Sequence, residues 1–124
     1  MKESRIPQFI GVHVVADFWS PKDIENVQQL KRLLLRAAKE ANSIPLEISL
    51  HAFSPCGLTG VVLVAESHIA IHTWPEIGYM AVDIFTCGKN VKPKKALEFL
   101  QKELKPKKVF IQTLKRGMLP DGIS

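Results

Sequence analysis

The sequence predicts an α+β fold, a two-layer sandwich in which helices cover one face of an antiparallel β-sheet. Two observations lead to this prediction. The expected elements follow the order β-α-β-β-β-β-α-β, so strands gather in mid-chain instead of alternating strictly with helices. Two amphipathic segments, opening near Pro21 and at Pro93, each offer one apolar face to a sheet. With 124 residues in all, we expect a single domain over residues 1–124.

The first strand is expected at residues 9–18, where β-branched and aromatic residues dominate. A helix should follow, because Ser20 is a good N-cap and Pro21 suits the first helical position. Its buried stripe would consist of Ile24, Val27, Leu30, Leu34, Ala37 and Ala41. We expect this helix to end near Asn42, since Pro45 opposes continuation.

A second strand is expected at residues 46–53, and the composition of residues 54–57 predicts a turn. The apolar stretch that follows contains too many β-branched residues for a comfortable helix. We therefore expect strands there, with residues 61–65 in one and residues 69–71 in the next.

A further strand is expected at residues 79–86. Pro93 should open the second helix, which would bury Ala96, Leu97, Leu100 and Leu104. Residues 108–114 complete the expected sheet, and the tail from Pro120 to Ser124 is expected to be loose.

The composition is that of an ordinary folded protein, with 46% hydrophobic and 23% charged residues. No run approaches the roughly 18 apolar residues that a membrane helix needs. Residues 1–7 lack the apolar core of a signal peptide. Two cysteines, Cys56 and Cys87, are too few for a disulfide framework. We expect a cytoplasmic protein with free thiols.

The net charge of +5 comes mainly from lysines late in the chain. They alternate with apolar residues such as Leu97 and Leu100, as on the wet face of an amphipathic helix. This pattern favours a solvated face over a nucleic-acid patch. A non-enzymatic α+β module that binds nucleic acid remains the alternative from another functional class.

A polar interruption in an apolar stretch marks the candidate chemistry. Glu66, Ser67 and His68 stand between the apolar runs at residues 61–65 and 69–71. Polar groups in such a place are unfavourable unless they are hydrogen-bonded or employed. A tight hairpin here would ordinarily use Asn-Gly or Asp-Gly. We therefore expect a function other than turn formation for these residues.

The local pattern alone leaves several interpretations open. On a continuous strand His68 and His72 share one face, and Ser67 points to the other. Two histidines and a cysteine would suit a metal, but no recognised ligand spacing is present, so we expect no metal. A serine hydrolase would be expected to carry a Gly-x-Ser-x-Gly elbow around Ser67, which is absent. A hydrogen-bonded histidine pair in a β core is the remaining alternative.

Two longer motifs carry a resemblance to a known family. Residues 57–76 include Gly-Leu-Thr-Gly-Val-Val-Leu-Val-Ala-Glu, then Ser-His, then Ile-His-Thr-Trp-Pro-Glu, and residues 83–88 read Asp-Ile-Phe-Thr-Cys-Gly. Both resemble the prokaryotic, bacterial and archaeal, S-adenosylmethionine decarboxylase proenzymes, which depend on a pyruvoyl group. The resemblance extends over nearly the whole chain. It implies a sheet with helices stacked against it and a dimer of the cleaved subunit.

The resemblance implies that the chain cuts itself between Glu66 and Ser67. Ser67 would attack the Glu66 carbonyl and become the covalent pyruvoyl cofactor. His72 would be the base in this processing, and Thr59 stands where the family usually has an assisting serine. Threonine keeps the hydroxyl but is stiffer at χ1. The products would be residues 1–66, the β chain, and residues 67–124, the α chain.

The resemblance also assigns roles in turnover. The pyruvoyl group would form a Schiff base with the substrate, and Cys87 would be the proton donor. Phe53 would stack on adenine and Glu76 would hold ribose hydroxyls. The implied activity is decarboxylation of S-adenosylmethionine in spermidine biosynthesis, whereas Cys56 receives no role.

Related arginine decarboxylases use the same pyruvoyl machinery and would form agmatine. An arginine pocket would need a carboxylate that pairs with the guanidinium. Asp17, Glu47 and Asp83 are candidates only if they line the cavity. We favour S-adenosylmethionine and retain arginine as the alternative substrate.

Overall fold

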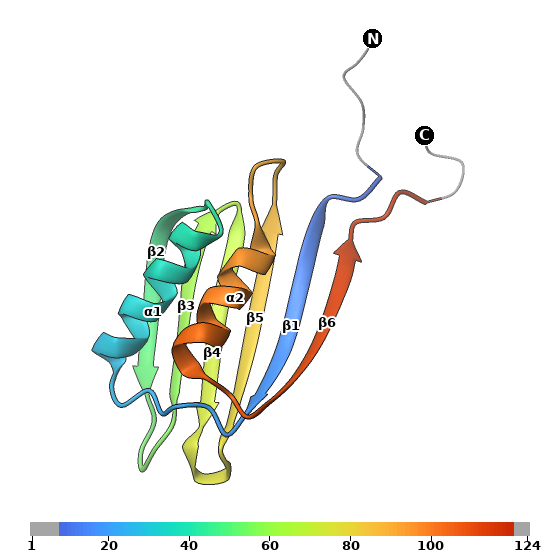
Figure 1. Cartoon of the computed structure of the whole chain (residues 1–124). Coiled ribbons are helices and arrows are strands. Elements are labelled where there is room, and N and C mark those ends of the chain that lie inside the picture. Colours follow the sequence, from blue (N-terminus) through green and yellow to red (C-terminus); the bar gives the residue numbers. More distant parts are fainter. Residues whose placement is uncertain (1–7, 121–124) are drawn as a thin grey trace.

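The computed structural model describes residues 8–120, which form one six-stranded sheet and two α-helices (Figure 1). A short 3-10 turn, η1 (Pro75–Ile77), joins two of the strands. The other elements are, in chain order, β1 (Gly11–Trp19), α1 (Val27–Glu40), β2 (Ile44–Ala52), β3 (Leu58–Ala65), β4 (Ser67–Trp74), β5 (Tyr79–Cys87), α2 (Pro93–Leu104) and β6 (Lys108–Arg116).

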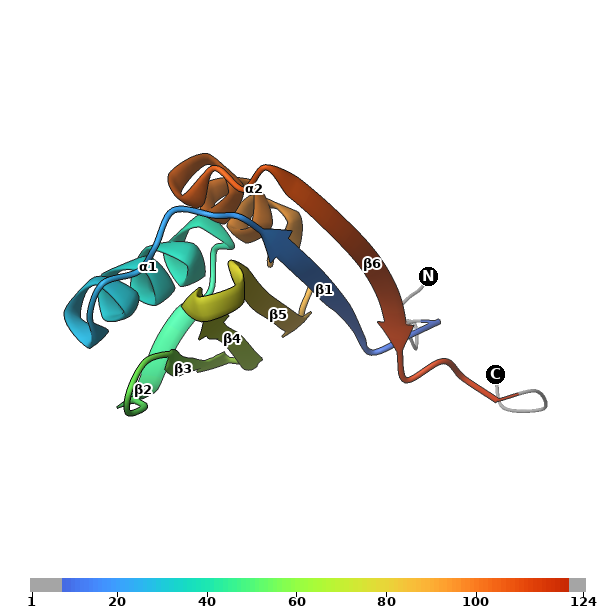
Figure 2. The same ribbon diagram turned by 90° about the horizontal axis from the view of Figure 1, so that it is seen from below.

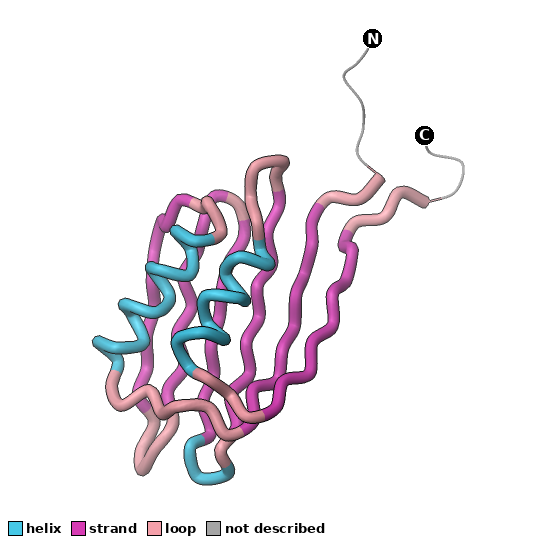
Figure 3. Tube along the Cα trace, in the orientation of Figure 1, coloured by secondary structure: helices cyan, strands magenta, loops and turns pink. Residues whose placement is uncertain are grey.

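The strands follow one another across the sheet in the order β2-β3-β4-β5-β1-β6, and every neighbouring pair is antiparallel. Both helices lie on the same face, so the opposite face of the sheet is open (Figures 2 and 3). The expected α+β sandwich and its element order are therefore confirmed. We call the uncovered side the open face.

The core lies between the helices and the sheet because alternate strand residues point toward α1 and α2. Val62, Ile69 and Ile84 on this side are fully buried, as are Leu34 of α1 and Leu100 of α2. The intervening residues of β3, β4 and β5 form the open face, and all of them except the buried Ala70 are at least partly exposed. The polar side chains of the strands therefore lie mainly on the open face.

The expected start of the first helix was wrong. The helix begins at Val27, and Asn26 caps it by accepting a hydrogen bond from the Gln29 backbone nitrogen at 2.9 Å. Ser20 instead has a φ of 54°. The segment after it runs from β1 past the end of the sheet to α1, near the opposite edge (Figure 1). Since α1 packs over β2 and β3, this crossing occupies the residues that carried the local cap signal.

The buried stripes of both helices are confirmed except at Val27, which is only partly buried. Ile24 and Ala41 are buried but lie outside α1. The second strand begins at Ile44 and includes Pro45, which the edge position of β2 tolerates. The expectations for residues 1–7 and for the tail after Pro120 lie outside the described residues. None of the described helices is long and apolar enough to cross a membrane.

Candidate active site

The Glu66–Ser67 bond lies at the tip of the β3–β4 hairpin. Val64 pairs with Ser67, so only Ala65 and Glu66 connect the two strands. Two-residue connections favour glycine, asparagine or aspartate because the turn needs positive φ values. Here the positive value falls on Ser67, whose φ is 113°. Such a conformation is strained for a residue with a side chain.

Cys87 lies at the same end of the sheet as this hairpin. Ser67 pairs with Thr86 of β5, and Cys87 is the next residue. Cys87 in turn pairs with Gly11 of β1, where an added Cβ would lie 2.8 Å from the Cys87 Sγ. The half-buried free thiol therefore occupies space that the glycine leaves open. We call the end that holds Glu66, Ser67 and Cys87 the cleavage end.

Thr59 and His72 form a second group at the opposite end of the hairpin. They are paired residues of β3 and β4, and the Thr59 Oγ1 lies 3.1 Å from the His72 Nδ1. Strand alternation places both on the open face, where the His72 ring lies 6.3 Å from the Trp74 ring. We call this end of the sheet the histidine end.

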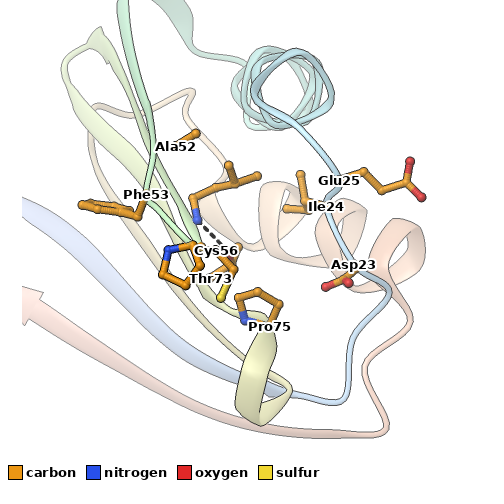
Figure 4. A pocket seen from close by; sticks show the side chains of 11 residues that line it. Asp23, Ile24, Glu25, Ala52, Phe53, Cys56, Thr73 and Pro75 are labelled. Atoms are coloured by element: carbon orange, nitrogen blue, oxygen red, sulfur yellow. Dashed lines mark hydrogen bonds between the residues drawn. The ribbon is translucent and has the colours of Figure 1, made fainter.

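Phe53 and Glu76 also lie near the histidine end, on the loops that flank β3 and β4. Phe53 lines a cavity of about 520 Å³ together with Cys56, Thr73 and Pro75 (Figure 4). The Cys56 Sγ is 3.5 Å from the Glu76 Oε1. Beside these loops, the Leu58 backbone nitrogen of β3 donates a hydrogen bond to the Thr73 Oγ1 of β4. The contact between Cys56 and Glu76 was not expected from the sequence.

The two groups are not brought together within one chain. Ser67 and His72 are five residues apart on β4, which corresponds to about 16 Å along an extended strand. In Figure 1 the β3–β4 turn is at the top of the sheet and the β2–β3 loop is at the bottom. His72 of this chain is therefore too far away to reach the α-proton of its own Ser67.

Of the three carboxylates considered for an arginine pocket, Asp17 and Asp83 are diagonal neighbours on the open face, whereas Glu47 lies apart from them. Asp17 accepts a hydrogen bond from the Tyr79 hydroxyl at 2.5 Å and lines a separate cavity of about 360 Å³ beside β6. Asp83 lies 3.6 Å from His13, and Glu47 is exposed on the edge strand β2. Partial burial and, to a smaller extent, the hydrogen bond to Asp17 raise the pKa of Tyr79 to about 12.

Within residues 8–120, no group of three or more histidine, cysteine or acidic side chains is arranged to hold a metal ion. The lysines of α2 lie on its exposed side, and Lys95 pairs with Glu98 at 3.7 Å. This placement agrees with the expected solvated face of the second helix.

Comparison with known proteins identifies a family. Residues 12–117 match the family model described as S-adenosylmethionine decarboxylase. The chain is 39% identical to an S-adenosylmethionine decarboxylase proenzyme of Methanococcus maripaludis over 115 residues, which cover 91% of this chain and 94% of the relative. It is 45% identical to one from Sulfurihydrogenibium over 113 residues, which cover 90% of this chain and 85% of the relative.

A solved structure agrees with these sequence matches. The adenosylmethionine decarboxylase from Aquifex aeolicus superimposes with a TM-score of 0.85 at 37% sequence identity. The alignment covers 95% of this chain and 99% of that protein. The overall fold and the expected family are thereby confirmed.

Proposed function

The chain belongs to the S-adenosylmethionine decarboxylase family, and we propose from this that it decarboxylates S-adenosylmethionine after cleaving itself between Glu66 and Ser67. The observation that carries the proposal is the position of Ser67. Ser67 follows Glu66 at the tip of a tight hairpin and has a φ of 113°. Cys87 is on the neighbouring strand, next to the residue that pairs with Ser67. Strain beside a peptide bond favours its rearrangement.

Self-cleavage begins at the Ser67 hydroxyl. Its Oγ attacks the Glu66 carbonyl carbon, and the bond from that carbon to the Ser67 nitrogen breaks, leaving an ester. A base removes the Ser67 α-proton, the Cβ–Oγ bond breaks, and Glu66 leaves as a carboxylate terminus. The dehydroalanine at position 67 then takes up water and releases ammonia to give the pyruvoyl group. The chain is thus divided into residues 1–66 and residues derived from 67–124.

The base for this elimination is His72, with Thr59 as its hydrogen-bond partner. Imidazole suits the task because its ordinary pKa lies near neutrality. Since His72 lies about 16 Å along β4 from its own Ser67, the base must come from a second copy of the chain. In the dimer that we propose, the histidine end of one copy faces the cleavage end of the other.

The open face suits such a dimer. Register and strand alternation place five large apolar side chains on it, each between 37% and 55% exposed. They are Trp19, Leu63, Trp74, Phe110 and Leu114. Trp19 and Trp74 both pack against Tyr79 at the histidine end, and an exposed aromatic cluster of this kind marks an interaction surface. Apposition of two open faces would cover it and complete two sites at once.

In turnover, the pyruvoyl group supplies a ketone that takes up the substrate amine and accepts the electrons released with carbon dioxide. Cys87 then gives the thiol proton to the substrate α-carbon. Phe53 offers an aromatic face for adenine, and Glu76 a carboxylate for the ribose hydroxyls. We assign the reaction to spermidine biosynthesis in the cytoplasm.

Arginine is the second candidate substrate because the machinery at Ser67 would be the same. The S-adenosylmethionine assignment is supported by the family match and by the aromatic face and carboxylate near one cavity. The test is release of carbon dioxide from carboxyl-labelled S-adenosylmethionine and arginine, side by side. We expect release from S-adenosylmethionine alone, and none from Ser67→Ala. Release from arginine alone would select the alternative, and release from neither would refute a decarboxylase of these substrates.

A further inference from the structure

Arg116 reaches from the outermost strand toward the cleavage end. It lies on β6, yet its guanidinium carbon is 5.5 Å from the centre of the Phe85 ring on β5. The side chain therefore extends across β1, which lies between these strands. Phe85 pairs with His68, the residue after Ser67. The guanidinium thus lies against β5, the strand that pairs with the one carrying the cleavage site.

Gly11 makes this approach possible. It is paired with Cys87 on one side and with Arg116 on the other. A Cβ at this glycine would lie 2.8 Å from the Cys87 Sγ and 2.9 Å from a carbon of the Phe85 ring. No side chain therefore stands on β1 between the thiol and Arg116.

His13 holds the guanidinium in this position. The His13 Nδ1 lies 3.3 Å from an Arg116 nitrogen, and the His13 ring packs against Phe85 with 5.3 Å between centres. A guanidinium only donates, so Nδ1 must accept and the proton of neutral His13 is on Nε2. That nitrogen faces the Asp83 carboxylate at 3.6 Å. His13 thus lies between Arg116 and this carboxylate, although its Nε2 makes no hydrogen bond within residues 8–120.

We propose that Arg116 binds the carboxylate of the substrate's amino-acid end, with His13 as a positioning residue. The inference rests on the proposed function. The carbon that receives the Cys87 proton is the one that carried this carboxylate, so the carboxylate must lie close to the thiol. Arginine suits the contact because its planar fork pairs with a carboxylate through two parallel hydrogen bonds.

This contact belongs to the bound substrate and is lost as carbon dioxide leaves. Removal of an interaction that is no stronger in the transition state raises KM and does not lower kcat. Arg116→Gln should therefore raise KM for S-adenosylmethionine by about 10- to 100-fold, the range for a charged hydrogen-bonded pair. We expect kcat to change by less than about threefold. His13→Gln should raise KM in the same direction by a smaller factor.

The decisive comparison uses decarboxylated S-adenosylmethionine, the product, as a competitive inhibitor. The product lacks the carboxylate, so its inhibition constant should be unchanged by Arg116→Gln. Arg116→Lys keeps the positive charge and should recover part of the KM change. Lys115→Gln is the matched control, because Lys115 is on the other face of the same strand and should leave both constants unchanged.

Equal weakening of substrate and product, or a fall in kcat with unchanged KM, would overturn the proposal. Self-cleavage of each variant is measured by intact mass before the kinetics. If neither Arg116 variant cleaves, Arg116 acts in processing and the carboxylate assignment is wrong. If the unaltered protein releases no carbon dioxide from S-adenosylmethionine, it is the proposed function that fails.

Discussion

Thr59 and His72 face each other across the β3–β4 hairpin, with the Thr59 Oγ1 3.1 Å from the His72 Nδ1. The contact fixes one ring nitrogen of His72 and thereby orients the other. Because the two residues are a directly paired position of neighbouring strands, the sheet itself sets their separation. Under the proposed function, this pair is the prepared base for self-cleavage.

Removal of the threonine hydroxyl should slow self-cleavage. We expect Thr59→Ala to lower the first-order rate by about 10- to 100-fold, as for loss of a hydrogen bond to a group that becomes charged when it takes up the proton. The rate is read from the decay of the intact chain on denaturing gels. Thr59→Ser keeps the hydroxyl and should cleave within about threefold of the unaltered rate. Equal slowing in both variants would show that the methyl group, and not the hydroxyl, matters.

Two defective chains should rescue each other if the base comes from a second copy. We expect neither His72→Ala nor Ser67→Ala to cleave when it is expressed alone. In a mixed dimer, an intact His72 from the Ser67→Ala chain faces an intact Ser67 on the other chain. Co-expression should therefore produce cleavage of the His72→Ala chain only, detected by an affinity tag on that chain.

The control for this experiment is co-expression of His72→Ala with Thr59→Ala. Both changes fall at the histidine end. In every mixed dimer, each cleavage site therefore faces a Thr59–His72 pair in which one of the two residues is altered. Cleavage should then be no faster than for Thr59→Ala alone. Failure of the first mixture to cleave, with mixed dimers shown to be present, would place the base within the same chain.

Cys87 should separate processing from turnover. We expect Cys87→Ser to cleave normally, since the thiol takes no part in forming the pyruvoyl group. Its kcat should fall by about 10²- to 10⁴-fold, the usual contribution of a positioned proton donor. The measurement is labelled carbon dioxide release from fully cleaved protein. An uncleaved Cys87→Ser chain would instead assign the thiol to processing.

Hydrophobic periodicity predicted most of this fold, because strand alternation and helical stripes report burial directly. The capping signal at Ser20 and Pro21, in contrast, placed the start of the first helix wrongly. The signal at Ser20 was local, whereas the true start at Asn26 depends on how far the chain travels across the sheet. Such a path depends on strand order, which the sequence pattern does not state.

The candidate site was only partly accessible from the sequence. The local pattern showed a polar interruption at Ser67, and the resemblance supplied the roles of His72 and Cys87. Neither pointed to Arg116, which meets His13 across 103 positions of sequence. That contact exists because β1 lies between β5 and β6.

Tyr79 should make the folded state sensitive to alkaline pH. Its pKa of about 12, against an ordinary 10.0, means that the folded protein holds the phenol proton more tightly than the unfolded chain. The corresponding stability is present below pH 10.0 and is lost as the pH rises toward 12. We expect a urea midpoint that falls across this range, and a smaller fall in Tyr79→Phe.

The titration can be followed at this residue alone, because Tyr79 is the single tyrosine of the chain. Phenolate absorbance should therefore rise with a midpoint near 12 in the folded protein and near 10.0 in urea. Asp17→Asn removes the charged acceptor and should lower the folded midpoint. A folded midpoint at the ordinary value would contradict the proposed contact between Tyr79 and Asp17.

Self-cleavage at Glu66–Ser67 is tested most directly by the intact mass of the purified chain beside Ser67→Ala. The proposed function predicts two polypeptides, one of residues 1–66 and one from residues 67–124 whose first residue has the mass of a pyruvoyl group. Ser67→Ala should give one uncut chain. A single uncut mass for the unaltered protein, or the same two fragments from Ser67→Ala, would contradict the proposal.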